Sequence, residues 1–458
     1  MTEKRNLSFG QLFNLSFGFF GVQIAYALQS ANISRIFATL GADPHQLSFF
    51  WVLPPLMGMI VQPLIGILSD KTWLGTFFGR RKFYLLIGAL IAVAVMVLLP
   101  NAGNFTFEQR ILLGLNSAMW FGLFSLMFLD TSINIAMQPF KMMVGDMVNE
   151  EQKGLAYSIQ SFLCNAGSLA GYIFPILFTW LGIQNTAPEG VIPDSVKWSF
   201  YVGAGILLLC VLYTFLAVKE MNPQEYAEFH GLNKKKEETV EQGPSNTKHI
   251  VRTFVTVGLV QFFCWAAFLF MWAYSNGAIA TLCFGWWKGN STASLAYQNA
   301  GNWVGVCFAV QAVGSMLWAL LIPVLERRFG NKWAYAISLL VGALGFISTI
   351  GFAWIPCDFI RDQYQYILLI SYALIGAAWA AMLALPFTII TNAISGSKYM
   401  GTLLGLFNCT ICLPQIVAAL VGGLILDLWY GFQEGMLITA GILLILGAVS
   451  VIFIKEKK

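Results

Sequence analysis

One acidic residue, Asp130, stands within an apolar run of the chain, "FSLMFLDTSINIAMQPF" (residues 124–140). Ionisable side chains inside a membrane segment are rare and energetically costly, and they usually belong to functional sites. Burial in a medium of low dielectric constant favours the protonated form of a carboxyl group, which lets it bind and release a proton near physiological pH. The structural alternative is an acid that pairs with a donor on a neighbouring helix. We predict that Asp130 binds and releases a proton.

Polar residues continue along the same predicted helix face after Asp130. Asn134 and Gln138 follow at positions i+4 and i+8, while apolar residues cover the rest of the helix. A continuous helix over residues 110–145 would place Asp130 about 30 Å from its start, deep in the bilayer. An apolar run over 111–129 that crosses the membrane alone would instead leave Asp130 at the cytoplasmic edge. The polar stripe favours the first arrangement and predicts that Asp130 faces a water-filled cavity.

Carboxamide and aromatic side chains recur within the apolar runs of both halves of the chain. A neutral sugar offers hydroxyl groups and a weakly apolar ring face, so amides and aromatic planes suit a site for it. Each amide alone is more simply explained as a hydrogen bond between helices. Their number across many runs nevertheless favours a ligand site. The candidates are Gln29, Asn32, Asn134, Gln138, Gln160, Asn165, Gln261, Trp265, Asn276, Asn302, Gln311, Asn408 and Gln415.

A short basic loop, "GILSDKTWLGTFFGRRK" (residues 66–82), joins two of the apolar runs. Its Asp70, Gly79, Arg80 and Arg81 resemble, in type and spacing, the signature loop of the major facilitator superfamily. Charged groups at this place can cap helix ends and form a latch that breaks when two helical bundles move. The alternative is that the basic residues only anchor the loop on the cytoplasmic side. We predict a gating loop.

Arg35 lies near the outer end of the first predicted membrane helix. The simpler interpretation is that its side chain extends to the lipid headgroups, as long basic side chains do near helix ends. The alternative is a role in gating or in orienting a substrate.

The composition that surrounds these residues is that of a membrane protein. Of the 458 residues, 58% are hydrophobic and 10% are charged, which excludes an ordinary soluble domain. A bilayer core of about 30 Å requires about 20 apolar residues per helix. The sequence predicts twelve such helices, near residues 11–38, 47–69, 83–100, 110–145, 154–182, 198–219, 250–282, 296–323, 334–354, 364–392, 400–426 and 435–454.

Basic residues are distributed unevenly between the two predicted membrane faces. Of the 26 Lys and Arg residues, 21 lie in the termini or in loops on one face, and five lie on the other. Cytoplasmic loops carry the excess of positive charge. We therefore expect a multi-pass protein of the plasma (inner) membrane with both termini in the cytoplasm. The eight Cys and three His residues show no metal-site spacing, and no nucleic-acid signature is present.

The chain divides into two similar parts. The long charged stretch over residues 221–248 separates a bundle over 1–220 from a bundle over 249–458, with six predicted helices in each. The stretch over 66–90 is echoed over 323–344, which indicates an internal repeat. We expect an all-α membrane protein with two pseudo-symmetric six-helix bundles that rock about a central site.

Several stretches, in order along the chain, resemble plant sucrose transporters and their animal and bacterial relatives. These proteins are glycoside-pentoside-hexuronide:cation symporters of the major facilitator superfamily. The resemblance implies a proton-coupled glycoside symporter in which Asp130 holds the proton and Gln29 contacts the sugar. The matching stretches are "GVQIAYALQ" (21–29), "PPLMGMIVQPLIGILSD" (54–70), "FGRRKF" (78–83), "LDTSINIAMQPFKMMVGD" (129–146) and "GLFNCTICLPQIVAALVGG" (405–423).

The chain departs from this family at three positions that bear on substrate and coupling. Lys141 stands where plant members carry arginine, Asn276 where relatives often carry an aspartate, and Asn302 where plant members carry an arginine. Proton coupling then depends more heavily on Asp130. A maltose-like disaccharide is as well supported as sucrose.

We therefore predict import of a neutral disaccharide or glycoside with a proton as the coupling ion, by a monomer in the lipid bilayer that needs no cofactor. The alternatives are a uniporter, a cation-coupled carrier of a non-sugar solute, and a sugar sensor that does not transport. We do not expect an enzyme, because paired carboxylates or metal ligands at a membrane face are lacking in the sequence.

Overall fold

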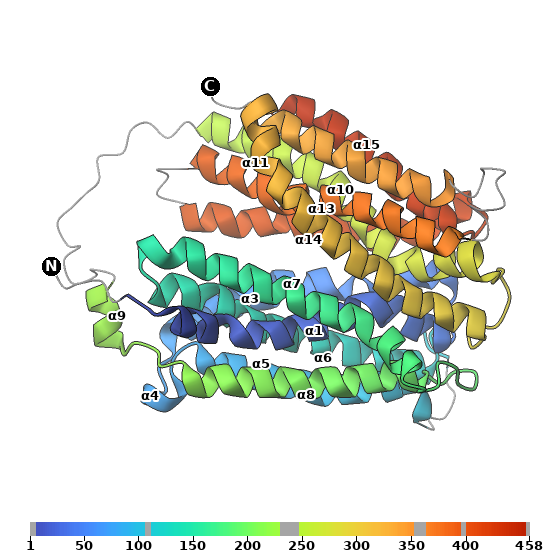
Figure 1. Cartoon of the computed structure of the whole chain (residues 1–458), viewed down its shortest axis with the longest axis horizontal. Coiled ribbons are helices and arrows are strands. Elements are labelled where there is room, and N and C mark those ends of the chain that lie inside the picture. The colour runs from blue at the N-terminus through green and yellow to red at the C-terminus, as the bar shows by residue number, and fades with distance from the viewer. Residues whose placement is uncertain (1–5, 106–110, 230–246, 352–362, 395–399, 455–458) are drawn as a thin grey trace.

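The computed structural model describes residues 6–105, 111–229, 247–351, 363–394 and 400–454. Within these ranges the chain is nearly all helical, as predicted, and the long helices run roughly along one axis (Figure 1). The first half contains α1 (Phe9–Thr39), α2 (Pro44–Phe50), α3 (Leu53–Lys71), α4 (Gly75–Phe78), α5 (Lys82–Leu98), η1 (Leu99–Asn104), α6 (Ser117–Met147), α7 (Glu150–Trp180), α8 (Asp194–Ala217) and α9 (Pro223–Phe229). The second half contains α10 (Thr247–Phe284), α11 (Leu295–Gly351), α13 (Tyr364–Ile394), α14 (Met400–Leu428), α15 (Glu434–Ser450) and η4 (Val451–Phe453).

Ten segments of the described chain are long and apolar enough to cross a membrane. One of them, α11, consists of two helices that meet at Gly330, which has φ 81° and ψ 162°. A further long helix, α1, has 31 residues and stands outside these ten segments. Each of the twelve predicted spans therefore overlaps a helix, although residues 352–354 of one span lie outside the described residues and the span over 47–69 is divided between α2 and α3.

The helix that carries Asp130 begins later than predicted. Asn116 caps α6 by accepting a hydrogen bond from the backbone N–H of Met119 (2.8 Å), so the helix starts at Ser117 and not near residue 110. The preceding residues form a tight turn, because Leu113 and Gly114 both have positive φ. Asp130 then lies about 20 Å from one helix end and about 25 Å from the other, near the middle of α6.

The two halves of the chain form two groups of helices. Figure 1 shows α1, α3, α5, α6, α7 and α8 together below, and α10, α11, α13, α14 and α15 together above. The groups meet where α7 packs against α11 and where α14 packs against α2 and α3. The predicted boundary over 221–248 stays a prediction, since α9 lies within it and residues 230–246 are outside the described ranges.

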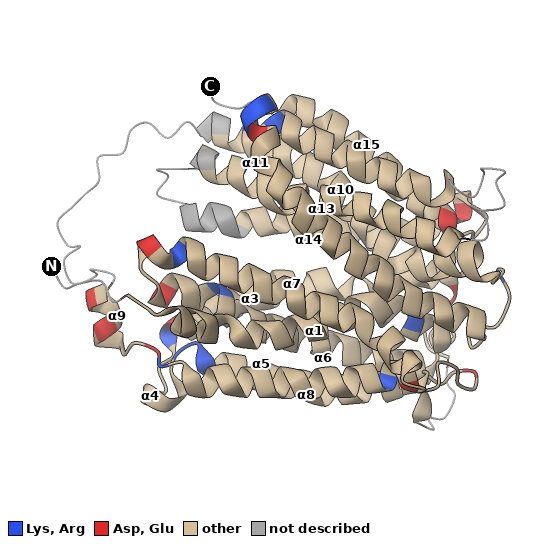
Figure 2. Cartoon of the chain, in the orientation of Figure 1, with Lys and Arg blue, Asp and Glu red and all other residues tan. Residues whose placement is uncertain are grey.

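Charged side chains gather at the two ends of the helical assembly (Figure 2). We call one end the basic end; it holds the loop over 71–82, α9 and the Gly330 junction. The opposite end, which holds the last turns of α1 and the loops over 181–193 and 285–294, is here the Arg35 end. Lys332 Nζ donates to the carbonyl of Ile452 (2.6 Å), which places the end of the last helix at the basic end.

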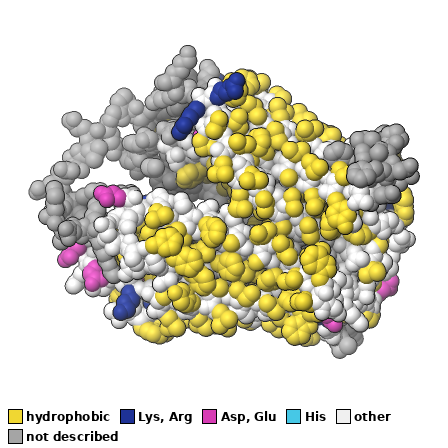
Figure 3. Space-filling view, in the orientation of Figure 1, with side chains coloured by type: hydrophobic (Ala, Val, Ile, Leu, Met, Phe, Trp, Pro, Cys, Tyr) yellow, Lys and Arg dark blue, Asp and Glu magenta, His cyan; other side chains and the backbone are white. Residues whose placement is uncertain are grey.

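Between these ends the visible surface is apolar. Hydrophobic side chains cover the middle of the space-filling view, whereas the coloured charged groups lie toward the ends (Figure 3). Many large hydrophobic side chains are exposed, among them Leu209, Leu216 and Leu320. An exposed apolar belt of this kind suits the lipid core of a bilayer.

Candidate functional site

The carboxyl group of Asp130 lies inside the first half and not against lipid. Its side chain is 2% exposed, and Oδ1 accepts a hydrogen bond from Gln29 Nε2 on α1. The other oxygen, Oδ2, is buried and has no hydrogen-bond partner among the described residues. The structure thus joins the two residues that the sequence assigned to the proton and to the sugar.

Further polar atoms near this pair are buried and unpartnered. On α1, Gln29 Oε1 and Asn32 Oδ1 make no hydrogen bond within the described structure, while Asn32 Nδ2 donates to the carbonyl of Leu28 (2.8 Å). Buried polar groups in proteins are nearly always hydrogen-bonded, so each exception calls for an explanation. A bound polar solute would supply the missing partners.

The second half contributes an equivalent set on α10. Gln261 Oε1 and Trp265 Nε1 are buried without a hydrogen-bond partner in the part of the chain described here, whereas the buried Asn276 interacts with the side chain of Tyr297. Gln261 Nε2 makes a 3.5 Å hydrogen bond to the carbonyl of Met382. Trp265 stands at the middle of α10, about 27 Å from either end. Two of these groups, from Gln261 and Asn276, offer acceptor oxygens, and the indole of Trp265 offers a donor.

Aromatic rings surround Trp265. Its ring lies 5.7 Å from that of Trp379 on α13, in an edge-to-face arrangement. The row continues to Trp272, whose ring is 5.8 Å from Trp379 and 5.6 Å from Trp51 of the first half. Flat aromatic faces next to unpartnered amides are the surfaces that a sugar ring uses.

Two residues connect α1 and α6 with the second half: Tyr26 near Asp130, and Lys141 about 16 Å further along α6. Tyr26 interacts electrostatically with Asp130 and also with Cys412 on α14. Lys141 interacts with the same Cys412 and with Cys164 on α7. The region around Asp130 is therefore bordered by helices of both halves.

The polar stripe of α6 faces α3. Asn134 Nδ2 donates to the carbonyl of Asp130 (2.8 Å), and Asn134 Oδ1 accepts from Gln62 Nε2 (2.6 Å). Lys141 Nζ donates to Gln62 Oε1 (3.3 Å), and Gln138 approaches α3 at Gly66. The sequence analysis missed Gln62, although a lone amide before Pro63 in an apolar run was a visible signal.

Several predicted sugar contacts instead make hydrogen bonds to helix backbone. Gln160 donates to the carbonyl of Phe140 (3.0 Å), Asn165 to that of Ser161 (2.8 Å) and Gln415 to that of Ile411 (3.0 Å). These bonds fit the alternative role of amides as links within and between helices. Gln311 on α11 is buried, and Asn408 on α14 is half-buried.

Arg35 does not extend to lipid headgroups; that prediction is wrong. Its side chain is 1% exposed and donates three hydrogen bonds, all to amide oxygens. The acceptors are Gln298 Oε1 (2.6 Å) and Asn302 Oδ1 (2.9 Å) of the second half and Asn185 Oδ1 (2.7 Å) of the first. Asn302 Nδ2 in turn donates to Thr179 Oγ1 (2.8 Å), so this predicted sugar contact is engaged at the Arg35 end.

Other hydrogen bonds cross between the halves close to Arg35. Ser34 Oγ donates to the carbonyl of Trp272 (3.1 Å), and Thr292 Oγ1 donates to that of Ala38 (3.1 Å). His45 Nε2 lies 2.9 Å from Asp427 Oδ1. All hydrogen bonds and ion pairs that join described residues of the two halves lie at this end. The structure is thus closed at the Arg35 end.

The predicted gating loop forms a charge network within the first half. Arg81 is 2% exposed; its Nη2 lies 2.5 Å from Asp70 Oδ1, and its Nε lies 2.9 Å from Asp146 Oδ2. Arg80 Nη2 contacts the same Asp146 oxygen at 2.9 Å. Burial is the largest single influence on the pKa of Arg80, and it lowers this pKa. The partly buried Asp146 and Tyr226 together outweigh burial, so the pKa of Arg80 is raised overall.

Glu220, which the sequence analysis did not single out, caps this loop. Its carboxylate accepts hydrogen bonds from the backbone N–H groups of Arg80, Arg81 and Lys82 (2.6–2.9 Å), where α5 begins. An anion at a helix N-terminus is favoured by the helix dipole. Gly79, with φ 67°, lets the chain pass Glu220, since an added Cβ would lie 2.6 Å from its carboxylate.

Comparison with known proteins agrees with this arrangement. The pattern of the Major Facilitator Superfamily matches residues 15–286. Sucrose transport protein SUT1 of Oryza sativa subsp. japonica is 23% identical over 443 residues, covering 88% of this chain and 80% of the relative.

Solved structures share the fold. The crystal structure of nucleoside transporter NupG matches with a TM-score of 0.67 at 15% identity, covering 98% of this chain and 99% of that one. The D-xylose-proton symporter matches with a TM-score of 0.64 at 15% identity, covering 96% of this chain and 95% of that one. With helices in two groups, a charged loop after α3 and a family pattern that spans more than half its length, this chain belongs to the Major Facilitator Superfamily.

Proposed function

We propose that this chain is a proton-coupled symporter that imports a neutral disaccharide, sucrose-like or maltose-like, by alternating access. We place it as a monomer in the plasma membrane with the basic end in the cytoplasm, as the excess of positive charge there favours. The described conformation is then the one closed toward the outside.

The observation that carries the proposal is the set of unpartnered buried polar atoms on both sides of the interface. Gln29 Oε1 and Asp130 Oδ2 belong to the first half, and Gln261 Oε1 and Trp265 Nε1 belong to the second. A solute with many hydroxyl groups can donate to the oxygens and accept from the indole. The SUT1 relative, a sucrose transport protein by name, supports a sugar as that solute.

Gln29 offers a direct link between the proton site and the sugar site. Its Nε2 donates to Asp130, while its Oε1 is left for a ligand hydroxyl. The N–H donor of Gln29 stabilises the ionised carboxylate. A sugar hydroxyl that draws the Gln29 amide away from Asp130 would weaken this hydrogen bond and favour protonation, which would couple the binding of the two ligands.

In the proposed cycle, Asp130 takes up a proton and the sugar binds while the Arg35 end is open to the outside. Neutralisation of the carboxylate removes the penalty of enclosing a charge, so the loaded halves can close around the site. The basic end then opens, the sugar leaves, and Asp130 releases its proton to the cytoplasm. A membrane potential of 100 mV would add about 2.3 kcal/mol per charge to accumulation.

Uptake by proteoliposomes with an imposed pH gradient tests the proposal. Labelled sucrose, maltose and a nucleoside are supplied in separate arms, and we expect gradient-driven accumulation of at least one disaccharide. Asp130→Asn should abolish accumulation, because an amide cannot carry the proton, yet retain exchange of sugar across the membrane.

Asp194→Asn is the matched control, since Asp194 is 58% exposed at the start of α8 and pairs only with Lys197 at 3.4 Å in the described structure. It should accumulate sugar like the wild type. Uptake of a disaccharide that ignores the pH gradient would identify a uniporter, and accumulation by Asp130→Asn would refute the role of this residue.

A further inference from the structure

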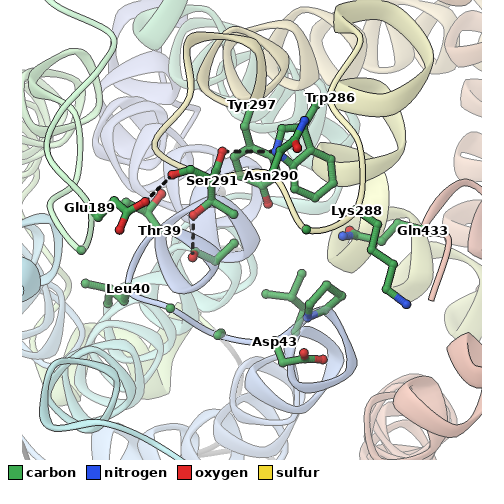
Figure 4. Close-up of a pocket in the computed structure, with 18 of the residues that line it drawn as sticks. Thr39, Leu40, Asp43, Glu189, Trp286, Lys288, Asn290, Ser291, Tyr297 and Gln433 are labelled. Atoms are coloured by element: carbon green, nitrogen blue, oxygen red, sulfur yellow. Dashed lines mark hydrogen bonds between the residues drawn. The ribbon is translucent and has the colours of Figure 1, made fainter.

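A cavity of about 610 Å³ lies at the Arg35 end, and two hydrogen bonds that join the halves, Ser291 to Glu189 and Thr292 to Ala38, lie in its wall. Residues 38–45, Leu47 and 189–190 of the first half line it together with residues 286 and 288–292, Tyr297 and Gln433 of the second (Figure 4). Its volume falls within the range of small-molecule sites, about 300–1,000 Å³. Because both halves supply its walls, the cavity has this shape only while the Arg35 end is closed.

Two carboxylates on the first-half wall have acceptor capacity to spare. Asp43 Oδ1 lies 2.6 Å from His45 Nδ1, and Glu189 Oε1 accepts a hydrogen bond from Ser291 Oγ (2.9 Å). Glu189 Oε2 takes part in no hydrogen bond between described residues, and Asp43, which also caps the start of α2, lines the cavity at an exposed position. Burial raises the pKa of Asp43, but hydrogen bonds from His45 and the charge of Lys288 outweigh this effect and lower it overall, so Asp43 is ionised at neutral pH.

The opposite wall adds a third acceptor and an aromatic surface. Gln433 is 4% exposed, and its Oε1 is buried without a hydrogen-bond partner among the described residues. Trp286 packs against Tyr297 with a ring-centroid distance of 5.0 Å. Lys288 Nζ already donates to the carbonyl of Tyr430 (2.9 Å), so its ammonium is engaged. The lining therefore favours a ligand that is rich in donors and has an apolar face.

We propose that this cavity binds a neutral glycoside from the outside and that the bound glycoside holds the Arg35 end closed. The proposal rests on the proposed sugar transport, which makes glycoside the solute present at this mouth. Sugar hydroxyls would donate to Asp43, Glu189 and Gln433, and the ring face would lie toward Trp286.

The position of the cavity gives this site a regulatory effect. A ligand that binds one conformation better than another shifts the population toward that conformation. Glycoside in the cavity bridges the two halves in the closed arrangement, so it opposes the return of the carrier to the outward-open state. Uptake should therefore rise and then fall as the external glycoside concentration increases.

Protection of an engineered cysteine tests the site without relying on transport. Asn290 lines the cavity, and Asn290→Cys in the full-length protein would be reacted with a membrane-impermeant maleimide added outside vesicles. We expect maltose or sucrose to slow labelling at least threefold, and choline to have no such effect. The wild-type protein, labelled in parallel, gives the background from native cysteines.

Two variants of the cavity lining, each combined with Asn290→Cys, identify where the protecting sugar binds. Glu189→Ala, a change at an exposed position, and Gln433→Leu should each remove the protection by sugar, whereas Gln29→Ala at the central site should retain it. Protection by choline alone, protection lost only with Gln29→Ala, or no protection by either sugar would overturn the proposal. Protection by sugar in a protein that takes up no disaccharide would instead refute the transport proposal and leave the outer site standing.

Discussion

The two ends of the molecule use positive charge in different ways. At the Arg35 end, one buried guanidinium donates only to neutral amides, and two of its three acceptors belong to the opposite half. At the basic end, Arg80 and Arg81 form ion pairs with Asp70 and Asp146, and all of these residues belong to the first half.

This difference separates the part that must move from the part that must stay rigid. Opening the Arg35 end would return one cation and several amides to water, which can replace each hydrogen bond at little net cost. Breaking a partly buried ion pair would leave an uncompensated charge, a far larger penalty. The charge network at the basic end thus strengthens one bundle, while mainly neutral hydrogen bonds, together with the partly exposed His45–Asp427 pair, join the two bundles that separate in each cycle.

The largest effect on uptake should follow from a substitution that forces α7 and α11 apart. A Cβ on Gly305 would lie 2.1 Å from the carbonyl oxygen of Tyr172, a backbone atom of the other half. Gly305→Leu should therefore prevent closure of the Arg35 end and reduce uptake by about fiftyfold to 150-fold, since overlap with a backbone atom belongs to the upper part of the overpacking range, about 2.3–3 kcal/mol.

The control for this substitution is Gly205→Leu, because a Cβ at the exposed Gly205 meets no atom within 4 Å. Uptake by this variant should match that of the wild type. Normal uptake by Gly305→Leu would show that the described contact is not part of the transport cycle.

An intermediate effect is expected when the guanidinium is removed. Arg35→Ala deletes three hydrogen bonds and leaves Gln298 and Asn302 with unsatisfied oxygens, so the closed state should lose about 2 kcal/mol relative to the open state. A cysteine introduced as Ser34→Cys, 4% exposed in the wild-type structure, should then react with external maleimide about thirtyfold faster.

Arg35→Lys serves as the comparison for Arg35→Ala, because lysine keeps the charge but cannot match the planar, multiple donors of arginine. Its labelling rate should fall between those of the wild type and the alanine variant. Equal labelling of all three proteins would mean that Arg35 does not hold this end closed.

The smallest effect on transport should come from the basic end. Asp146→Asn removes the ionised partner of Arg80 and one of the two ionised partners of the buried Arg81, which should cost about 1–3 kcal/mol and lower the midpoint of thermal unfolding by about 2–5 °C. Labelling of Ser34→Cys in the same background should stay within about twofold of the wild-type rate. A large rise in labelling with unchanged thermal stability would reverse the roles assigned to the two ends.

The helical architecture could be read from the sequence because each span needs only a run of apolar residues, which is local information. The start of α6 could not, because the apolar residues Ile111, Leu112 and Leu113 satisfy the same criterion although they precede a turn. The capping side chain of Asn116, together with Gly114, was the signal that would have placed the boundary correctly.

The candidate site was predictable only in part. Asp130 stood out as a charge in an apolar run, and its contact with Gln29 agrees with the family resemblance. The burial of Arg35 was not foreseeable, since its acceptors on α11 lie more than 260 residues away along the chain. The sequence also could not separate amides that keep an unpartnered oxygen, such as Gln261, from amides that link helices, such as Gln160. That distinction depends on neighbours in three dimensions.

Because the acceptors of Arg35 are all uncharged amides, its hydrogen bonds should depend little on the salt concentration and pH around the carrier. Dissolved salt weakens attraction between opposite charges, but the amides around this guanidinium carry no charge for ions to screen. Amides also do not titrate in the range where organisms live. The contribution of Arg35 to closure of this end should therefore be the same in fresh and in brackish water, whereas the partly exposed His45–Asp427 pair at the same end is weakened by salt.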